Sequence, residues 1–324
     1  MRFGKRRLVI GIFSLAVVAF GLPLLYTNAS RVSTHKTNSW SIGIYTGKTP
    51  FDLSDPDSIR NPVLTAAQVT DVKADFVADP FMIRKDSVWY MFFEVLNSLS
   101  AQGDIGLAES RDGKEWHYRR IVLNESFHLS YPLVFLHAGE YYMIPESAES
   151  GKLMLYRANA FPYNWEMVQV LVEGQFGDHV LFEHEGQWWI IAISEPRTHS
   201  TTRLFYADSL KGEYTEHPAS PIVRNDASRA RPGGRIPLYR GKRYWFAQDC
   251  DPTYGRKLNA FRIVKLSRDE YLEEPFDGNP VLEGGHYRWA RRGMHHIDAH
   301  QVSEREWFAC VDGYYRNFIL RIEY

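Results

Sequence analysis

One hairpin pattern recurs five times along this chain, and it constrains the fold more than any other feature. Aromatic residues spaced 52, 47, 55 and 63 positions apart each lie inside a short apolar run: Tyr90, Tyr142, Trp189, Tyr244 and Trp307. Another short run begins 11 positions before each of them, at Asp79, Tyr131, Asp178, Gly233 and His296. A constant offset with turn residues between the two runs predicts five equivalent β-hairpins.

Further strand-like segments follow the hairpins, such as residues 104–110 and 152–158. Each repeat then holds about four strands in roughly 50 residues, the size of a propeller blade. We therefore expect an all-β fold, a five-bladed β-propeller over residues 40–324. A β-sandwich also has many short strands, but it does not explain the constant offset. Because the last repeat is short of an outer strand, we expect Trp40–Gly47 to supply it and close the ring.

The first 26 residues have the pattern of a signal anchor. A basic cluster over Arg2–Arg7 precedes 19 uncharged residues, Leu8–Tyr26. That is about the length a helix needs to cross the hydrocarbon core. We expect one N-terminal transmembrane helix in a single-pass protein, with residues 1–26 as the cytoplasmic end and anchor and the propeller outside the cytoplasm. Residues 27–39 are polar and are expected to be a tether. Cleavage as a signal peptide, which would release a secreted protein, is the alternative.

Composition excludes some partners. The net charge is −1, so no global field would attract nucleic acid, and we expect no nucleic-acid partner. Aromatic residues make up 15% of the chain, which suits both sheet packing and sugar stacking. Only Cys250 and Cys310 are present, at different heights in their strands, so we expect two free thiols.

The hairpin repeat predicts a ring of polar residues at one mouth of the channel. The first strand of a hairpin starts where its second strand ends, so Asp79, Glu94, Glu146 and Asp178 should meet there from different blades. Glycoside cleavage needs one carboxylic acid to protonate the leaving oxygen and a second carboxylate to activate water or attack the sugar. The same acidic positions are also explained by turn chemistry and by solvation of strand ends.

The hairpin sequences resemble known families. The segments DPFMI, GEYYMIPES and EGQWWIIA are similar to the five-bladed propeller superfamily of invertases and of arabinan- and xylan-degrading glycosidases. Five further segments resemble the propeller domain that precedes the glycosyltransferase domain of plant glucosamine inositolphosphorylceramide transferases: Phe93–Asn97, Phe127–Phe135, Tyr141–Ser147, Ala230–Arg235 and Phe246–Cys250.

This resemblance implies roles for particular residues. The superfamily's nucleophile or base matches Asp79, and its general acid matches Asp178, a shorter carboxylic acid. Its remaining aspartate matches Tyr131, which leaves the trio incomplete. Glu146, on the neighbouring strand end, could replace one carboxylate.

Two functional hypotheses follow. The preferred one is a glycoside hydrolase-like enzyme for an extracellular or envelope glycan, with catalytic residues Asp79, Glu146 and Asp178. The alternative is a non-catalytic glycan-binding propeller that assists a partner glycosyltransferase or sugar-modifying enzyme. The expected substrate-binding residues are Glu94, His128, Tyr131, Arg231, Arg235, Gln248, Asp249, His295 and His296. No cofactor or metal is expected, although His296, Asp298 and His300 could line one strand face and bind an ion.

Overall fold

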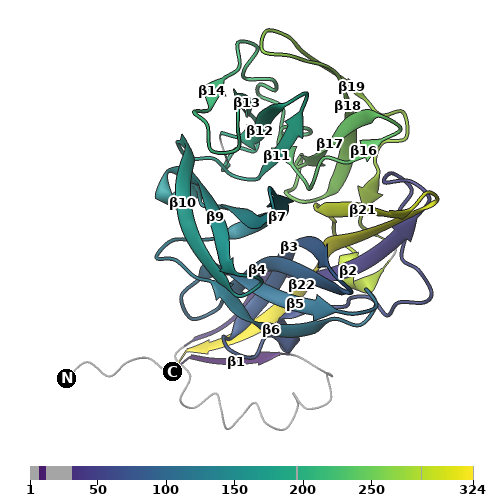
Figure 1. Cartoon of the computed structure of the whole chain (residues 1–324). Helices are drawn as coiled ribbons and strands as arrows, with labels where there is room; N and C mark the ends of the chain where they lie inside the picture. The colour runs from purple at the N-terminus through teal and green to yellow at the C-terminus, as the bar shows by residue number, and fades with distance from the viewer. Residues whose placement is uncertain (1–6, 12–30, 195, 286, 324) are drawn as a thin grey trace. The chain divides into compact units, whose positions relative to one another are not determined.

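A computed structural model describes residues 7–11, 31–194, 196–285 and 287–323. The chain divides into two compact units, residues 40–314 and a smaller unit of residues 1–39 and 315–324. Within the described part of the larger unit, five antiparallel sheets are arranged around a common centre (Figure 1), which confirms the five-bladed β-propeller.

The first three blades each contain four strands that follow one another in the chain. Their strands are β3 (Ala74–Lys85), β4 (Val88–Asn97), β5 (Gln102–Ser110) and β6 (His117–Leu123) in blade 1; β7 (Ser130–His137), β8 (Glu140–Glu146), β9 (Lys152–Ala160) and β10 (Asn164–Glu173) in blade 2; and β11 (His179–His184), β12 (Gln187–Ile193), β13 (Thr202–Ala207) and β14 (Thr215–Glu216) in blade 3.

Blade 4 is broken into shorter pieces. It contains β15 (Arg231–Pro232), β16 (Leu238–Tyr239), β17 (Lys242–Asp249), β18 (Lys257–Leu266), β19 (Tyr271–Pro275) and β20 (Leu282–Glu283). Its inner part is not continuous: β15 and β16 both pair with β17, and the segment between them carries Gly233 and Gly234. The backbone of Gly234 bridges in parallel to Ile297 of the next blade, which joins blades 4 and 5 at the channel.

Blade 5 closes the ring with a strand from the other end of the chain. Its strands are β21 (Ile297–Ser303), β22 (Glu306–Glu323) and β2 (Arg31–Gly47), and β2 pairs with β22. The expected closure by Trp40–Gly47 is therefore confirmed, and the side chains of Ile42 and Ile44 are fully buried in the blade 5 to blade 1 core. Pairing the two chain ends removes the open sheet edge that an unclosed propeller would leave.

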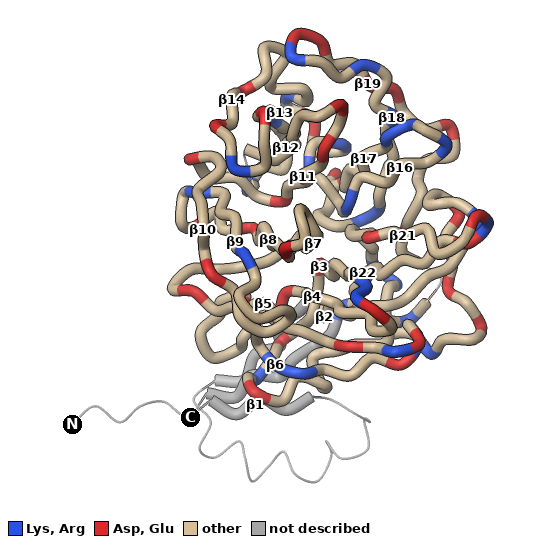
Figure 2. The backbone as a smooth tube through the Cα atoms, viewed as in Figure 1, with Lys and Arg blue, Asp and Glu red and all other residues tan. Residues whose placement is uncertain are grey.

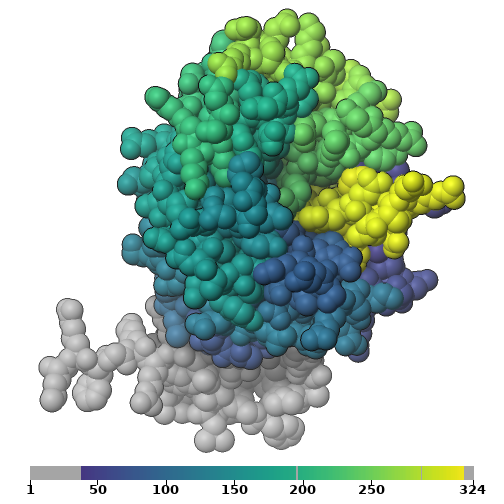
Figure 3. All heavy atoms as spheres, viewed as in Figure 1, coloured from purple at the N-terminus to yellow at the C-terminus, as the bar shows by residue number. Residues whose placement is uncertain are grey.

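Alternation along the central strands supplies apolar side chains to both neighbouring blades. Trp188 packs toward blade 2, whereas Trp189 packs toward blade 4. Trp307 and Phe308 divide in the same way between blades 4 and 1. Figure 3 shows that neighbouring blades contact each other in the described part of the chain; the hairpin of β21 and β22, in yellow, contacts blade 1, in blue.

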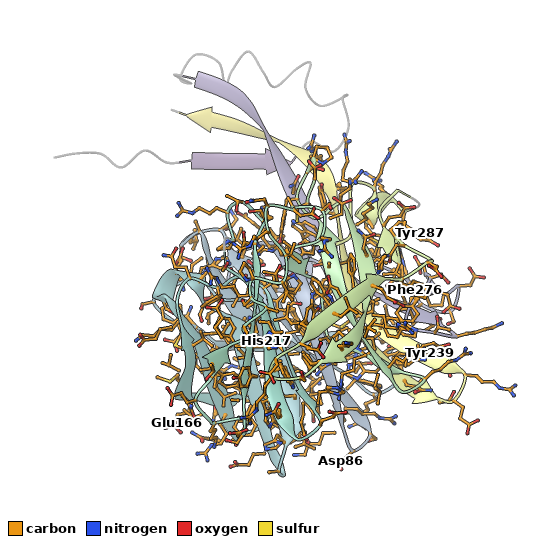
Figure 4. All side chains as sticks on the ribbon, turned by 90° about the horizontal axis from the view of Figure 1, so that it is seen from above. Asp86, Glu166, His217, Tyr239, Phe276 and Tyr287 are labelled. Carbon is orange, nitrogen blue, oxygen red and sulfur yellow. The ribbon has the colours of Figure 1, made fainter. Side chains whose placement is uncertain are left out.

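Loops add to the packing at the rim. Phe51 stacks on Phe276 with ring centroids 4.3 Å apart and meets Tyr239 edge-on at 5.5 Å. Figure 4 labels Phe276 and Tyr239 on this side of the propeller. Lys and Arg alternate with Asp and Glu over all blades (Figure 2), so the described surface has no extended field of one sign.

The N-terminal prediction falls largely outside the described residues. Residues 12–30, most of the expected membrane helix, are among those not described, and Arg7–Gly11 form strand β1, paired with β22. The strand β2 begins at Arg31, inside the segment expected to be a tether. The helices in the described ranges are 3-10 turns, η1 (Ala66–Gln68), η2 (Ala148–Ser150) and η3 (Arg288–Ala290), and none could span a bilayer. The anchor stays a prediction.

Candidate functional site at the channel mouth

Two strained residues lie within the inner strands of blades 1 and 2. Asp79 and Tyr131 have φ of 52° and 46°, and each precedes a proline inside a β-bulge. A bulge inserts an extra residue and redirects its side chain, and left-handed backbone at a non-glycine residue is a recurrent feature of functional sites. Both side chains are buried. The residues expected at the first two blades of the ring therefore occupy matching positions.

Contacts between blades confirm that the predicted ring positions meet. The Tyr131 hydroxyl accepts a hydrogen bond from the backbone N–H of Gly234 in blade 4. The Tyr131 ring also lies 5.1 Å from the His296 ring of blade 5, centroid to centroid. Gly234 is needed at this point, because its φ is +135° and a Cβ would lie 1.8 Å from the Ile297 carbonyl oxygen.

Asp178 is held as a carboxylate by two donors. Arg231 Nε and one Nη of Arg231 donate to its two oxygens at 2.7 and 2.9 Å, and Gln248 Nε2 donates as well. Burial opposes ionisation, but the Arg231 charge and the hydrogen bonds prevail and lower the pKa of Asp178 to about 2. With its oxygens engaged and its pKa depressed, Asp178 is poorly suited to donate a proton.

Glu146 is the proton-bearing partner of Asp178. Its carboxyl group shares a hydrogen bond with Asp178 and lies 3.4 Å from Arg231. Burial and the neighbouring Asp178 charge raise the pKa of Glu146 well above its ordinary value. Two carboxyl groups in one dry pocket separate their pKa values, which gives one acid and one carboxylate. Of the two carboxyl groups, Glu146 is therefore the one that favours the protonated form.

Asp79 lies among other acidic groups. Its backbone N–H donates to Asp312 at 3.0 Å, and its Oδ1 is buried without a hydrogen-bond partner, 3.8 Å from His295 Nδ1 and 4.0 Å from His296 Nδ1. Burial and the charge of Asp178 raise its pKa well above the ordinary value. Both ring nitrogens of His296 are also buried without a partner, and burial lowers the pKa of His296 to about 4. The Asp79 Oδ1 atom and the two His296 ring nitrogens are thus able to form hydrogen bonds that the protein itself does not provide.

Asp79, His295 and Asp312 also carry donor atoms within 4.8 Å of one another, a spacing suited to a metal. Two of these groups already bind each other, since His295 Nδ1 lies 2.9 Å from Asp312 Oδ1. The trio considered from sequence does not converge: Asp298 contacts His300 at 3.0 Å, whereas the His296 nitrogens have no partner.

Glu94 and His128 extend the site along blade 1. His128 Nε2 lies 3.3 Å from Glu94 Oε1, and His128 Nδ1 accepts the N–H of Gly103 at 3.0 Å. Glu94 is buried and its charge acts on both Asp79 and Glu146. The structure therefore groups Glu94 with the channel-mouth carboxyls.

Two residues that the sequence predicts to bind substrate, Arg235 and Asp249, form ion pairs away from the channel-mouth carboxyls. Arg235 pairs with Asp298 at 2.6 Å and donates to the Val134 carbonyl oxygen. Asp249 pairs with Arg256 at 2.6 Å and with Lys257 at 3.5 Å. The ion pairs recorded for these two residues are therefore not with the channel-mouth carboxyls.

Sequence reasoning gave no role to an aromatic group over the site. Tyr254 lies over the Arg231 guanidinium at 5.2 Å, stacks with His199 at 5.0 Å and meets His295 at 5.1 Å. Trp40 stacks on His295 at 3.9 Å. Tyr254 and His199 lie in loops, where no periodic pattern marks them, so only the aromatic identity of residues near strand ends could have drawn attention to them.

Comparisons with known proteins agree with this architecture. Residues 32–314 match the family described as glucosamine inositolphosphorylceramide transferase 1, N-terminal. The transferase of that name from Oryza sativa subsp. japonica is 38% identical over 322 residues, covering 93% of this chain and 43% of the relative. The Arabidopsis thaliana transferase is 36% identical, covering 89% and 41%. The chain thus spans about two fifths of the length of these relatives.

Solved structures share the fold at low identity. The catalytic domain of the Coprinopsis cinerea GH62 α-L-arabinofuranosidase aligns with a TM-score of 0.58 at 10% identity, covering 88% of this chain and 96% of that one. The Cellvibrio cellulosa α-L-arabinanase complexed with arabinohexaose aligns with a TM-score of 0.53 at 18% identity, covering 76% and 91%. These similarities support the propeller fold and no more.

Proposed function

Because this chain belongs to the family of the N-terminal part of glucosamine inositolphosphorylceramide transferase 1, we propose that its channel mouth binds a glycan or glycoconjugate for a sugar-transferring partner enzyme. The ring of buried carboxyl, imidazole and aromatic groups supports this proposal. Hydroxyl groups of a sugar both donate and accept hydrogen bonds, and this site offers both kinds of partner.

We favour binding over hydrolysis because most of the carboxyl groups at the channel mouth are held in ion pairs. Asp178 is committed to Arg231, Asp312 to His295, and Glu94 to His128. Asp79 and Glu146 make longer contacts, 3.8 Å to His295 and 3.4 Å to Arg231, and both carboxyls have raised pKa values that favour the protonated form. Hydrolysis needs an ionised base that is free to act beside the acid, and the ionised carboxylate beside Glu146, that of Asp178, is engaged by Arg231 and Gln248.

Hydrolysis is the second candidate because of one specific observation. Asp79 Oδ1 has no partner, so it could act as a base once ionised, with Glu146 as the acid. The solved glycosidases that share the fold make this chemistry worth testing. In that case activity should rise with pH as Asp79 ionises and fall as Glu146 loses its proton.

The test combines glycan arrays with a panel of aryl glycosides, using Asp79→Asn and Glu146→Gln. For a binding protein we expect wild-type glycan binding without turnover, weakened by roughly 1–3 kcal/mol in each variant because a buried polar group is mispaired. For a hydrolase we expect turnover that falls by about 10²–10⁴-fold in both variants.

Matched amide changes at exposed carboxyls control for folding. Asp86→Asn changes the exposed β3–β4 turn at the far end of the hairpin from Asp79, and Glu166→Gln changes the exposed strand β10 (Figure 4). Both should behave as wild type. Glycan binding at wild-type affinity in both Asp79→Asn and Glu146→Gln would show that the channel mouth is not the binding site.

A further inference from the structure

The channel-mouth site is closed over in this structure. Asp178 is 1% exposed, Asp79 is 4% exposed and Arg231 is 7% exposed. A glycan could therefore reach these groups only if something above them moves. The half-buried ring of Tyr254 lies directly on Arg231, and half-buried His199 both stacks on Tyr254 and contacts Arg231 through its Nδ1 at 3.1 Å.

Tyr254 belongs to a short connection between β17 and β18. Asp251, Pro252 and Thr253 are exposed, so ring contacts of Tyr254 make up much of the attachment of this connection to the site. Those contacts are with His199, His295 and Trp40, at 5.0, 5.1 and 6.3 Å. Segments held by few buried apolar contacts open at lower free energy than the core strands do.

Asp249 ties the two ends of this connection together. Its Oδ1 accepts the backbone N–H of Asp251 at 3.0 Å, and its Oδ2 binds Arg256 at 2.6 Å. Gly255 follows Tyr254 with φ of +69°, and a Cβ there would lie 2.7 Å from the Trp40 ring and 2.8 Å from the His295 ring. The two ends are thus fixed, while the exposed middle carries the ring that covers Arg231.

We propose that the segment Asp251–Gly255 is a gate over the channel mouth, with Tyr254 as its latch and Asp249 as the residue that positions its base. Opening would uncover the guanidinium of Arg231 and free the Tyr254 ring to stack on a sugar. Asp249 therefore acts through the gate and not as a contact to the glycan. The proposal rests on the proposed function for its purpose, but its test requires no glycan.

The two cysteines provide an internal reporter. Cys250 is a buried free thiol at the base of the gate, and its Sγ donates to Gln248 Oε1 at 3.9 Å. Cys310 is a free thiol that is fully buried in the core between blades 5 and 1, where it contacts the Pro80 carbonyl oxygen. Gate opening should expose Cys250 alone, whereas global unfolding exposes both.

The experiment follows N-ethylmaleimide labelling of the folded full chain, with each cysteine quantified by peptide mass spectrometry. We expect Cys250 to react at least about tenfold faster than Cys310, because local opening costs less free energy than global unfolding. Tyr254→Ala should raise the Cys250 rate by about tenfold more, since it removes several ring contacts that each contribute a fraction of that factor. His199→Ala and Asp249→Asn should raise it less, and Tyr254→Phe should leave it near the wild-type value.

Tyr163→Ala is the matched control, because Tyr163 is a partly exposed tyrosine of blade 2 that contacts Glu109, far in sequence from the gate. It should leave both rates unchanged. The Cys310 labelling rate reports any loss of global stability. The ratio of the Cys250 rate to the Cys310 rate therefore measures opening of the gate alone in every variant. Equal labelling of Cys250 and Cys310 in wild type, or a ratio unmoved by Tyr254→Ala, would overturn the gate. If wild type bound no glycan but its Cys250 to Cys310 labelling ratio behaved as expected, the gate would stand and the proposed function would be contradicted.

Discussion

Two arginine–aspartate pairs with buried aspartates line the channel, and they differ in what surrounds them. Arg235 pairs with Asp298 at 2.6 Å, and Arg231 pairs with Asp178 at 2.7 Å. Asp298 also accepts the N–H of Met82 at 2.7 Å and lies 3.0 Å from His300 Nε2. Arg235 and its partners thereby join blades 1, 2, 4 and 5 through a network in which both carboxylate oxygens of Asp298 have hydrogen-bond partners.

The pair at the channel mouth is built differently. Asp178 shares a hydrogen bond with a carboxyl group that has a raised pKa, and the nearby Asp79 Oδ1 and His296 nitrogens have no partner. Unpaired buried polar groups cost free energy, so they persist where a ligand or a reaction uses them. The two ion pairs therefore differ in the completeness of the hydrogen bonding around them, and the proposed binding site lies at the incomplete one.

The largest expected effect tests the structural pair. Asp298→Asn should lower the free energy of unfolding by about 2–4 kcal/mol, because it leaves the half-buried Arg235 charge without its partner and disturbs the fully buried acceptor of the Met82 N–H. Urea unfolding measures this change. Glu216→Gln breaks the exposed Arg203–Glu216 pair and should cost no more than about 1 kcal/mol. Equal losses in the two variants would show that the channel pair has no special role.

An intermediate effect concerns His296. Burial lowers its folded-state pKa from 6.5 to about 4, so between these values the unfolded chain binds a proton that the folded chain does not. Stability therefore falls as pH drops from about 6.5 to 4, with a contribution of up to about 1.4 kcal/mol per pH unit. Urea unfolding in this range should show a shallower slope for His296→Gln than for wild type. The slope should persist in part, since His179 is buried with a similar shift. An unchanged slope in the variant would contradict the neutral buried state of His296.

The smallest effect on stability is expected for Glu146→Gln. Below about pH 4.5 the carboxyl is protonated in the folded and the unfolded chain, and the amide resembles it, so unfolding should change by less than about 1 kcal/mol. The folded-state pKa of Glu146 is raised, so its stabilising contribution is present below the ordinary value of 4.5 and is lost as pH rises from there through the folded-state pKa. The variant lacks this loss and should become the more stable protein as pH rises. Parallel stability curves from pH 4 to 8 would show that the pKa of Glu146 is not raised in the folded state.

Much of the fold could be predicted from the sequence, because strand alternation and hairpin spacing are local. The 11-residue offset placed Asp79, Tyr131, Asp178, Gly233 and His296 in one ring, and the unpaired Trp40–Gly47 segment indicated how the ring closes. The candidate site was predicted less fully. Asp178 matched a general acid by position, but its bidentate contact with Arg231, 53 positions away, makes it a fixed carboxylate.

The sequence by itself therefore determined which inner-strand residues reach the channel mouth, since the period of two along a strand and the length of a turn decide where each side chain points. Only the tertiary structure decided which carboxyl holds a proton, which arginine serves which aspartate, and that Tyr254 covers the site. Those properties depend on burial and on charges from other blades, which come within a few ångströms only after the ring has closed.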